Sequence, residues 1–490
     1  MNKTYLKCIG CGTKYRLDGP YPVYGCENCE NDGVNHVLEK SLADDQLFPN
    51  LEEIIQRKNS ISNPFSIFRE FFFVYYLAQY LNVDYEAILC DINTGLKDIG
   101  ETIFQVTPIQ IIENLKLSQG KIFIKDETNN VTGSHKARHL MGNILYLEVL
   151  VRAGILKNKP KLAVYSCGNA ALGAAAVARA ARYYLDVFIP PNVNPKVTNT
   201  LKKHEANIVV CPRHKDETGD PCYNRFQQAL NAGSVPFSCS GPDNWSNIEG
   251  GQTLCLELMT QSIAKGFDFN SIVIQVGGGA LASSAIKTLE ELHQFGYINK
   301  IPRIYTMQTE GGYPLARAYY LLIQEIAKAN NLVCSLDFTK KDKRSEAIKE
   351  NWKIADYSRT KQNEILNIAR FIRDNYSSDK IQRILNIATK NMSPYMWSWE
   401  EEPHSIAHGI LDDITYDWFK IVQGMFKTGG LPVIINEEGL KEANRKALSC
   451  TNINADHTGT SGLAGYLALV KLGYLDDRDN VALCFTGAVR

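Results

Sequence analysis

The sequence predicts an α/β protein in which two parallel-sheet subdomains are sandwiched by helices, preceded by a small cysteine-rich module. Short apolar segments alternate with helix-like stretches, which is the pattern of parallel sheets covered by helices. These segments are 121–125, 161–165, 186–190, 207–211, 271–276, 303–308 and 481–485. With 490 residues, 44% of them hydrophobic, the chain can bury large cores in two or three domains.

The charge balance and the N-terminus indicate the compartment and the partners. Lys plus Arg and Asp plus Glu both number 53, so no net field attracts nucleic acid or an anionic membrane. The first residues lack the apolar core of a signal peptide, and no stretch approaches the roughly 18 apolar residues of a membrane span. Most of the 13 cysteines stand singly in apolar surroundings, as thiols do in a reducing compartment. We therefore expect a cytoplasmic protein that binds neither nucleic acid nor membrane.

Two Cys-x-x-Cys pairs predict a zinc-ribbon-like module over residues 1–40. Cys8 and Cys11 form the first pair, and Cys26 and Cys29 form the second. Four thiolates complete a tetrahedral Zn²⁺ site and leave no open position for chemistry, so we expect the ion to be structural. A module this short needs the roughly 10–16 kcal/mol that such an ion contributes. The alternative is a ribbon that has kept its cysteines without the metal.

Residues 41–110 are expected to form a helical segment between this module and the main fold, which spans 111–490. Apolar and mostly aromatic side chains recur along residues 65–77. Such a stripe packs in a core or against another subunit more often than it binds a ligand.

Lys136 is our candidate for a covalent centre. It ends the run Thr132-Gly133-Ser134-His135-Lys136, shortly after the strand-like segment 121–125. A lysine forms an imine with an aldehyde only as the free amine. Small neighbours, backbone N–H groups at a helix start and the adjacent Arg138 favour that form. The alternative is an ordinary helix capped by Ser134 or Thr132, with Lys136 on its solvated first turn.

Two later turns also join an apolar strand to a helix. The first is Ser166-Cys167-Gly168-Asn169-Ala170, where Asn169 adds a side-chain amide to the free N–H groups of a helix start. The second is Gly277-Gly278-Gly279, whose backbone can approach an anion closely enough to cradle a phosphate. Each turn is common alone, but a lysine turn, an amide turn and a glycine turn in this order are far more specific.

These motifs resemble those of the fold type II, tryptophan-synthase β-like, pyridoxal-phosphate enzymes, and within them the threonine-synthase-like branch. The family's Thr-Gly-Ser-Phe-Lys motif appears as Thr132–Lys136, its Ser-x-Gly-Asn turn as Ser166–Asn169, and its glycine loop as Gly277–Gly279. The segment Glu249–Thr253 and the C-terminal strand ending at Thr486 are further matches. The resemblance covers residues 105–320 and 400–490, which is most of the chain.

The resemblance implies a role for each motif. Lys136 would bind the aldehyde carbon of pyridoxal 5'-phosphate and, once displaced by an amino acid, would remove its α-hydrogen. Asn169 would hydrogen-bond the phenolate oxygen of the cofactor. The backbone of Gly277, Gly278, Gly279, Ala280 and Leu281 would hold the phosphate. Ser166, Cys167, Gly168 and Ala170 would bind the substrate carboxylate.

Thr486 would face the pyridine nitrogen. A neutral hydroxyl cannot keep that nitrogen protonated as an aspartate would, so less negative charge spreads into the ring and expulsion of a β-substituent is favoured. Thr486 as a plain strand-ending residue is an equal alternative.

The chain departs from the threonine-synthase pattern on both sides of the lysine. His135 replaces the usual Phe and lies either near the phosphate or in an uncharged packing position. Ala137 replaces an Asp that many threonine synthases carry.

Three other segments have secondary roles. His404 and His408 have a metal-like spacing, but a helix start near the active site is the better interpretation of that segment. The turn Asp456–Gly462, before a predicted helix through Leu469, borders the cofactor in the family. Residues 325–400 form a charged helical insertion, for which exposure to solvent is favoured over a lid or an oligomer contact. The small mobile subdomain is expected over residues 137–245.

The sequence therefore predicts a pyridoxal-phosphate lyase or synthase of amino-acid metabolism, and a homodimer as is usual in the group. It would catalyse α,β-elimination or β/γ-replacement on a small hydroxy- or O-substituted amino acid. Serine/threonine dehydratase, ammonia-lyase and threonine synthase activities all remain open. The alternative from another class is a non-catalytic protein that acts as an interaction module through its zinc ribbon.

Overall fold

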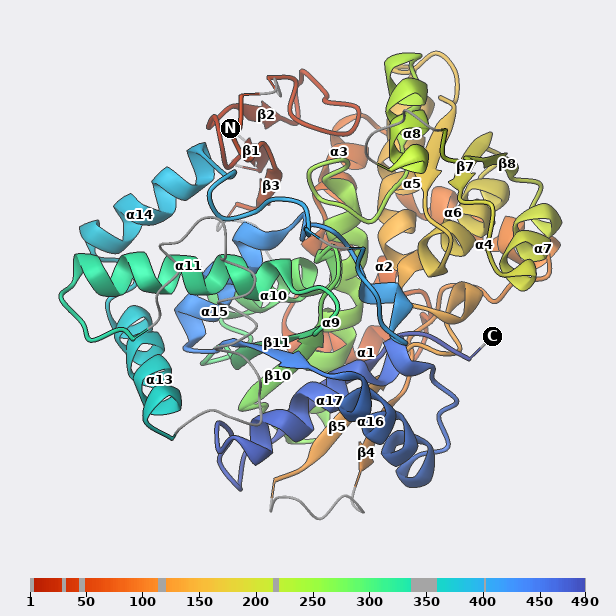
Figure 1. The fold of residues 1–490 in the computed structure, drawn as a ribbon. Coiled ribbons are helices and arrows are strands. Elements are labelled where there is room, and N and C mark those ends of the chain that lie inside the picture. Colours follow the sequence, from red (N-terminus) through yellow and green to blue (C-terminus); the bar gives the residue numbers. More distant parts are fainter. Residues whose placement is uncertain are drawn as a thin grey trace.

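The computed structural model describes residues 4–28, 32–43, 49–112, 120–214, 220–335, 359–400 and 402–489. The described strands form three sheets: a three-stranded sheet in the order β2-β1-β3, a six-stranded sheet in the order β12-β11-β10-β13-β5-β4, and a four-stranded sheet in the order β8-β7-β6-β9. Helices surround the two larger sheets, and the small sheet lies at the periphery (Figure 1). The prediction of two parallel sheets covered by helices, behind a small N-terminal module, is confirmed.

The N-terminal sheet is antiparallel and docked on the main fold. It consists of β1 (Tyr5–Cys8), β2 (Lys14–Arg16) and β3 (Leu38–Ser41). The Trp245 amide donates to Tyr24 O at 3.0 Å, and the Tyr146 hydroxyl donates to Pro22 O at 2.8 Å. Buried Lys40 of β3 pairs with two carboxylates of the main fold, at 3.6 Å and 3.4 Å. The module is therefore held by the core and does not hang from a linker.

The segment predicted as helical is divided into short helices. These are α1 (Leu51–Arg57), α2 (Pro64–Ile67), the 3₁₀ turn η1 (Arg69–Phe71), α3 (Phe73–Tyr80) and α4 (Tyr85–Asp98). Pro64 begins α2, where its missing N–H costs nothing. Phe65, Phe68, Phe71 and Phe72 are all buried, so the aromatic stripe belongs to the core.

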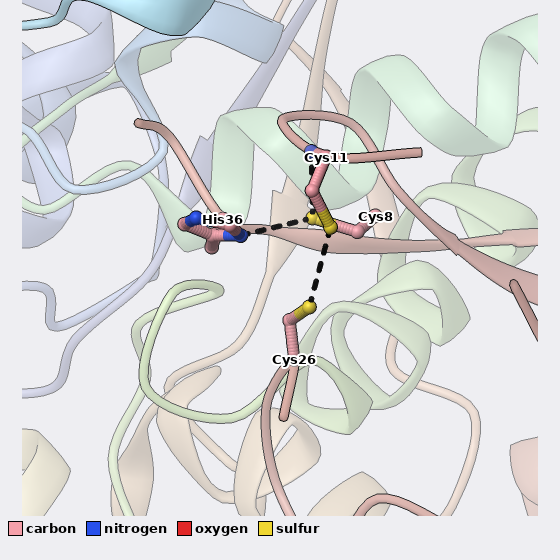
Figure 2. A group of neighbouring side chains, drawn as sticks. All are labelled: Cys8, Cys11, Cys26 and His36. Atoms are coloured by element: carbon pink, nitrogen blue, oxygen red, sulfur yellow. Dashed lines mark hydrogen bonds between the residues drawn. The ribbon is translucent and has the colours of Figure 1, made fainter. Parts of the chain in front are cut away.

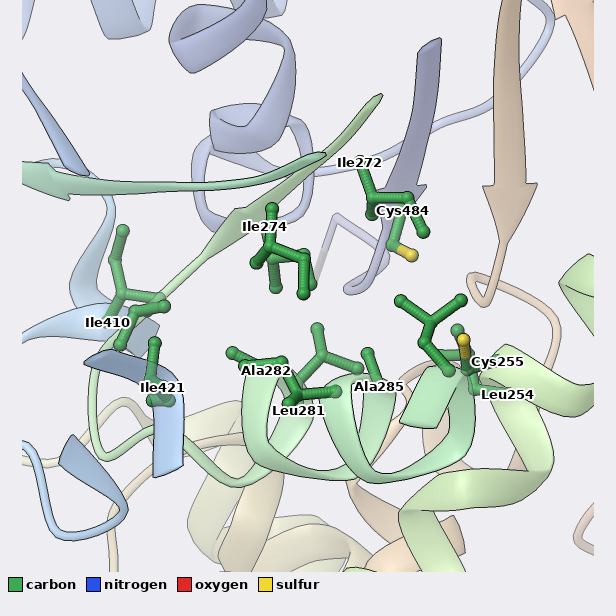
Figure 3. Close-up of a cluster of buried hydrophobic side chains, with 14 of the residues drawn as sticks. Leu254, Cys255, Ile272, Ile274, Leu281, Ala282, Ala285, Ile410, Ile421 and Cys484 are labelled. Atoms are coloured by element: carbon green, nitrogen blue, oxygen red, sulfur yellow. The ribbon is translucent and has the colours of Figure 1, made fainter. Parts of the chain in front are cut away.

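The larger sheet is parallel except at one edge. It contains β5 (Ile122–Asp126), β10 (Ser271–Gln275), β11 (Arg303–Thr309), β12 (Pro432–Ile435) and β13 (Val481–Phe485), with β4 (Ile109–Ile112) antiparallel to β5. Around this sheet lie α5 (Lys136–Arg152), α9 (Ser246–Ala264), α10 (Ala280–Gln294), α16 (Glu437–Cys450) and α17 (His457–Lys471). Figure 3 shows Ile272 and Ile274 of β10 above Ala282 and Ala285 of α10. Such apolar faces bury the sheet on the side of α10.

The smaller sheet is entirely parallel and carries the amide turn. Its strands are β6 (Leu162–Tyr165), β7 (Leu185–Ile189), β8 (Asn207–Val210) and the two-residue β9 (Val235–Pro236). Its helices are α6 (Asn169–Ala180), α7 (Pro195–Lys203) and α8 (Pro221–Asn231). All seven predicted strands are present; β4, β9 and β12 were not predicted.

The described part of the 325–400 segment has one solvent-exposed face and one buried face. After α11 (Pro314–Ala329), it contributes α13 (Arg359–Asp374) and α14 (Asp379–Lys390), and both helices contact α11 or α15 (Trp418–Thr428). Ile368, Ile372, Ile381 and Leu385 are buried. The interpretation of this segment as a solvated insertion is therefore wrong for these helices. Each helix is amphipathic, and its apolar face packs in the core.

Within the residues that the structure describes, no helix combines the length and the apolar character needed to cross a membrane.

Candidate active site

Lys136 is the first residue of α5 and is half-buried. The turn before it needs left-handed backbone, with φ of 54° at Thr132 and 69° at Gly133. Its residues are tied to the end of β13: Ser134 forms a bridge with Gly487, and Ala488 N donates to Gly133 O at 2.9 Å. No side chain caps the helix, so neither Ser134 nor Thr132 has the capping role of the alternative interpretation. The buried Ser134 hydroxyl has no hydrogen-bond partner among the described residues.

Glycines hold α5 against two neighbouring helices. A Cβ on Gly250 of α9 would lie 2.8 Å from Gly142 N and 2.9 Å from His139 O, both on α5. A Cβ on Gly173 of α6 would lie 3.1 Å from Ala137 N. Since these contacts are to backbone atoms, only glycine permits them. The Glu249–Thr253 segment of α9 therefore positions α5, the helix that begins with the lysine. The Glu249 carboxylate accepts hydrogen bonds from the amides at the start of α3.

Arg138 belongs to a buried ion-pair network. Its buried guanidinium pairs with Glu127 at 2.7 Å and with Glu257 at 2.6 Å, and Lys125 also pairs with Glu257 at 2.6 Å. Two carboxylates thus compensate two cationic side chains. Arg138 thereby anchors α5 to the end of β5 and to α9, while its effect on Lys136 stays a prediction.

Two histidines beside the lysine are uncharged. Burial, aided by the Lys136 charge, lowers the pKa of His139 to about 3 and also lowers the pKa of His135 well below its ordinary value. His139 Nδ1 lies 2.9 Å from Asn247 O, which can only accept, so the proton is on Nδ1. Nδ1 of His135 lies 3.3 Å from Thr486 O. His135 is therefore buried and uncharged next to the end of β13, and its place relative to the phosphate stays a prediction.

The amide turn reaches the same end of β13. Gly168 precedes the first residue of α6, Asn169. Asn169 Nδ2 lies 3.0 Å from the position of a Cβ on Gly487, and Asp456 Oδ1 lies 3.3 Å from it. Asp456 caps α17, accepting from Gly459 N at 2.6 Å. The lysine turn, the amide turn and the Asp456 turn thus converge at Thr486 and Gly487.

The Thr486 hydroxyl is held by the side-chain amide of Gln275, which no sequence motif marks. Gln275 Nε2 lies 2.9 Å from Thr486 Oγ1, 3.0 Å from Cys484 O and 3.3 Å from Gly459 O. Backbone carbonyls can only accept, so the amide nitrogen must face them, and at the shortest of these distances it donates to the Thr486 oxygen. The Thr486 hydroxyl hydrogen is then left to donate to a ligand.

The glycine loop follows β10 and begins α10. Gly279 has φ of 104°, which only glycine adopts without strain, and Ala280 and Leu281 are the first residues of the helix. The Asp412 carboxylate packs against this loop, with Oδ2 3.6 Å from the position of a Cβ on Gly278 and closer to that of a Cβ on Gly277. The exposed His404 and His408 lie in a segment with only the 3₁₀ turn η4 (His408–Ile410), not the predicted helix start. Among the described residues they belong to no metal-like cluster.

Two carboxylates, Asp412 and Asp417, interact with the Lys136 charge, and Asp243 interacts with Asp417; none of the three was predicted as a site residue. Burial raises the pKa of Asp412 and Asp243, and raises that of Asp417 to about 7, while the Lys136 charge opposes the shift at Asp412 and Asp417. Asp417 also accepts from Gly241 N at 3.2 Å. No strand-turn-helix signal marks these residues, because they lie in loops that meet the site only through the tertiary fold.

A second candidate site lies in the N-terminal module. Ligand atoms of Cys8, Cys11, Cys26 and His36 lie within 4.8 Å of one another (Figure 2). Cys11 Sγ and Cys26 Sγ are 3.7 Å apart, close to the roughly 3.8 Å expected between thiolates 2.3 Å from a tetrahedral zinc. Cys29, the fourth predicted ligand, lies outside the described residues. His36 was missed because four cysteines already completed the expected set.

A stretch that contains the lysine, amide and glycine turns matches a known family. Residues 101–370, more than half of the chain, match the family described as pyridoxal-phosphate dependent enzyme. The chain belongs to this family. The residues present fit the cofactor, since they include a lysine at a helix start, a glycine turn at the start of α10, and a hydroxyl hydrogen on Thr486 that the Gln275 bond leaves available.

Curated relatives match part of the chain. An L-serine dehydratase from Saccharomyces cerevisiae is 27% identical over 218 residues, 43% of this chain and 62% of the relative. A cysteine synthase from a Flavobacterium species is 26% identical over 186 residues, 38% of this chain and 58% of the relative. The chain thus spans about three fifths of the length of these relatives.

Solved structures share the fold. Threonine deaminase isoform 2 from Solanum lycopersicum has a TM-score of 0.52 at 14% identity, covering 83% of this chain and 90% of that one. Serine racemase from Dictyostelium discoideum has a TM-score of 0.51 at 16% identity, covering 82% and 98%. At these identities the likeness is one of fold alone.

Proposed function

We propose that the protein is a pyridoxal-phosphate-dependent lyase that eliminates the β-substituent of a small hydroxy- or O-substituted amino acid. The observation that carries this proposal is the hydrogen bond from Gln275 Nε2 to Thr486 Oγ1 at 2.9 Å. It leaves the Thr486 hydroxyl hydrogen available to donate to the pyridine nitrogen, and a neutral hydroxyl does not hold that nitrogen protonated as a carboxylate would. An unprotonated ring takes up less negative charge, which favours loss of a leaving group over racemisation.

The chain's own residues have separate tasks. The cofactor, when bound, withdraws electrons from the substrate's α-carbon. Lys136 binds the cofactor and, once displaced, its Nζ takes the α-proton. Asn169 orients the cofactor's phenolate oxygen. Backbone amides from Gly277 to Leu281 hold the phosphate. The Ser166–Ala170 turn, with Cys167 and Gly168, binds the substrate carboxylate at the start of α6.

The comparisons support elimination more than replacement. The curated relative with 27% identity is an L-serine dehydratase. A threonine-synthase-like replacement is the second candidate, but it rests on the motifs around Lys136, where His135 and Ala137 depart from that branch. The comparisons give no support to a non-catalytic interaction module.

Two variants test the lysine. Purified protein should absorb near about 410–420 nm, as pyridoxal imines do, and Lys136→Ala should lose the band. Lys196→Ala, an exposed lysine on α7, is the matched control and should retain it. A protein that shows no such band after reconstitution with the cofactor would refute the proposal.

The Thr486 argument has its own test. With serine and threonine, the protein should release ammonia and a keto acid, and racemised substrate should be a minor product. Thr486→Asp should protonate the ring and raise the fraction of racemised substrate per turnover. An unchanged product ratio in that variant would remove the argument from Thr486. A screen that adds diaminopropionate, homoserine and its phosphate ester identifies the leaving group.

We also propose that the N-terminal cluster binds a structural zinc ion. Three thiolates with either His36 or Cys29 complete its ligands. Metal analysis should find about one zinc per chain, and Cys11→Ser should lose it with turnover largely retained. Loss of zinc in His36→Ala but not in Cys29→Ser would assign the fourth ligand to His36. Abolished turnover in folded, zinc-free protein would refute a purely structural role.

A homodimer in the cytoplasm is part of the same proposal, because it is the usual state of this group of enzymes. Light scattering on the eluting protein should give twice the 54.9 kDa chain mass. A monomeric mass would contradict it.

A further inference from the structure

Residues 405–417, the 405–417 segment, pack directly on the glycine loop. A Cβ on Gly277 would lie 2.8 Å from the Ile410 Cα, and a Cβ on Gly278 would lie 2.8 Å from the Tyr416 ring. A Cβ on Gly279 would lie 3.1 Å from Asp417 Cβ. The absence of a Cβ at the three glycines therefore lets the 405–417 segment approach the backbone of the loop where the phosphate would bind.

Hydrogen bonds fix the segment in that position. Thr415 Oγ1 donates to Gly277 O at 2.9 Å, and Asp417 N donates to Gly278 O at 3.1 Å. On the same side of the loop, the Asp412 carboxylate packs on the glycines: its Oδ2 would clash with a Cβ on Gly277 and would lie 3.6 Å from a Cβ on Gly278. A carboxylate of the same chain thus already lies against the loop that would hold the phosphate.

The segment also reaches across to the smaller sheet. The hydroxyl of Tyr416 lies 2.7 Å from that of Tyr165, which ends β6 directly before the amide turn. Asp412 is half-buried and lies within electrostatic reach of the Lys136 ammonium. Asp412 is therefore placed between the two groups that would hold the cofactor at its phosphate and at its aldehyde.

We propose that Asp412 is an internal competitor for the phosphate of the cofactor and thereby sets the protein's affinity for it. The inference rests on the proposed pyridoxal-phosphate function. The Asp412 carboxylate and a phosphate held by the same loop cannot occupy one place, and a phosphate of charge about −2 is repelled by a carboxylate beside it. The 405–417 segment must therefore carry Asp412 away from the loop when the phosphate enters. Tyr165 and Tyr416 hold the segment in the competing position.

Replacement by asparagine separates charge from shape. Asp412→Asn keeps the shape of the side chain but removes its negative charge. Asp413→Asn is the matched control, because Asp413 is the exposed neighbour and its side chain makes no hydrogen bond or ion pair with the loop among the described residues. Tyr416→Phe keeps the ring against Gly278 and removes only the hydroxyl that meets Tyr165.

The experiment titrates cofactor-free protein with pyridoxal phosphate and measures Kd from the visible absorbance band. Asp412→Asn should bind about 10-fold more tightly than the unaltered chain, whereas Asp413→Asn should stay within about 2-fold. Tyr416→Phe should bind faster, with a smaller gain in affinity. An unchanged or weaker Kd in Asp412→Asn overturns the inference, since Asp412 would then support the site and not compete for it.

A second titration keeps this result separate from the proposed function. Inorganic phosphate, followed by calorimetry, probes the loop without the pyridine ring or the lysine. If no variant binds the cofactor, the proposed function fails, and tighter phosphate binding by Asp412→Asn would still support competition at the loop. Equal phosphate binding by Asp412→Asn and the unaltered chain would overturn it.

Discussion

Gly250→Ala tests the crossing of α5 and α9 that carries Lys136. The added methyl would lie 2.8 Å from Gly142 N and 2.9 Å from His139 O, and closer still to the Arg138 carbonyl. Ordinary contact begins at 3.4 Å, so the helices must separate by more than half an ångström. All of these atoms belong to the backbone of α5, and no side-chain rotation can move them away.

Two opposing terms set the magnitude. Alanine in a helix is favoured over glycine by about 1 kcal/mol, because glycine loses more backbone entropy on folding. Overpacking of a close-packed core costs about 1–3 kcal/mol, and backbone contacts belong at the upper end of that range. We therefore expect Gly250→Ala to lower the free energy of unfolding by about 2 kcal/mol. Because Arg138 lies two residues after Lys136 in α5, the displacement should also lower the affinity for pyridoxal phosphate.

Denaturant unfolding and cofactor titration provide the assay, with Gly424→Ala as the control. Gly424 is also a buried helical glycine, but its added methyl would meet only side-chain atoms of Ile286, at 2.6 to 3.0 Å. Ile286 can change rotamer, so the control should lose less stability. The reasoning is refuted if Gly250→Ala is as stable as the unaltered protein, or loses no more than Gly424→Ala.

Three further predictions concern buried charge. Arg138→Met leaves Glu127 and Glu257 without their buried partner and should cost about 3–5 kcal/mol in denaturant unfolding; a loss under about 1 kcal/mol would contradict the assigned network. His139 has a pKa of about 3 when folded against an ordinary 6.5, so its contribution to the free energy of unfolding is complete above pH 6.5. Below pH 6.5 that contribution declines by about 1.4 kcal/mol per pH unit. His139→Phe should flatten this pH dependence of stability, and an equal slope would reject the pKa shift. The pH dependence from Asp417 has the opposite sign, because its folded pKa of about 7 exceeds the ordinary 3.8. Its contribution to the free energy of unfolding is complete below pH 3.8 and is lost as the pH rises to 7. Relative to the unaltered protein, Asp417→Asn should therefore gain more stability at pH 8 than at pH 4.

The fold and the candidate lysine could be predicted because their signals are local. Each apolar strand such as Ile122–Asp126 is bounded by a turn whose glycines, hydroxyls or amides stand next to it in the chain. Parallel strands place their carboxyl ends at one edge of a sheet, so the turns that follow such strands are predicted to lie close together, and the family resemblance predicts that Lys136 and Thr486 contact one cofactor. The structure places both turns at the end of β13, while the chemical roles of these residues stay predictions.

Other features were missed for lack of such a signal. β9 has two residues, and β4 is a four-residue, half-exposed edge strand in which Gln110 interrupts the apolar run that marks a buried strand. The helices of the 325–400 segment were assigned to solvent because the segment is rich in charge, although Ile365, Ile368 and Ile372 recur at helical spacing along α13.

The sequence by itself determined the α/β architecture, the family motifs around Lys136 and the cysteines of the N-terminal module. Only the tertiary structure decided what faces them: Gln275 on Thr486, Asp412 on the glycine loop, and His36 beside Cys8. The physical reason is range. Strand, turn and cap preferences act between residues a few positions apart, whereas a hydrogen bond between residues 275 and 486 exists only after the sheet has brought β10 and β13 together.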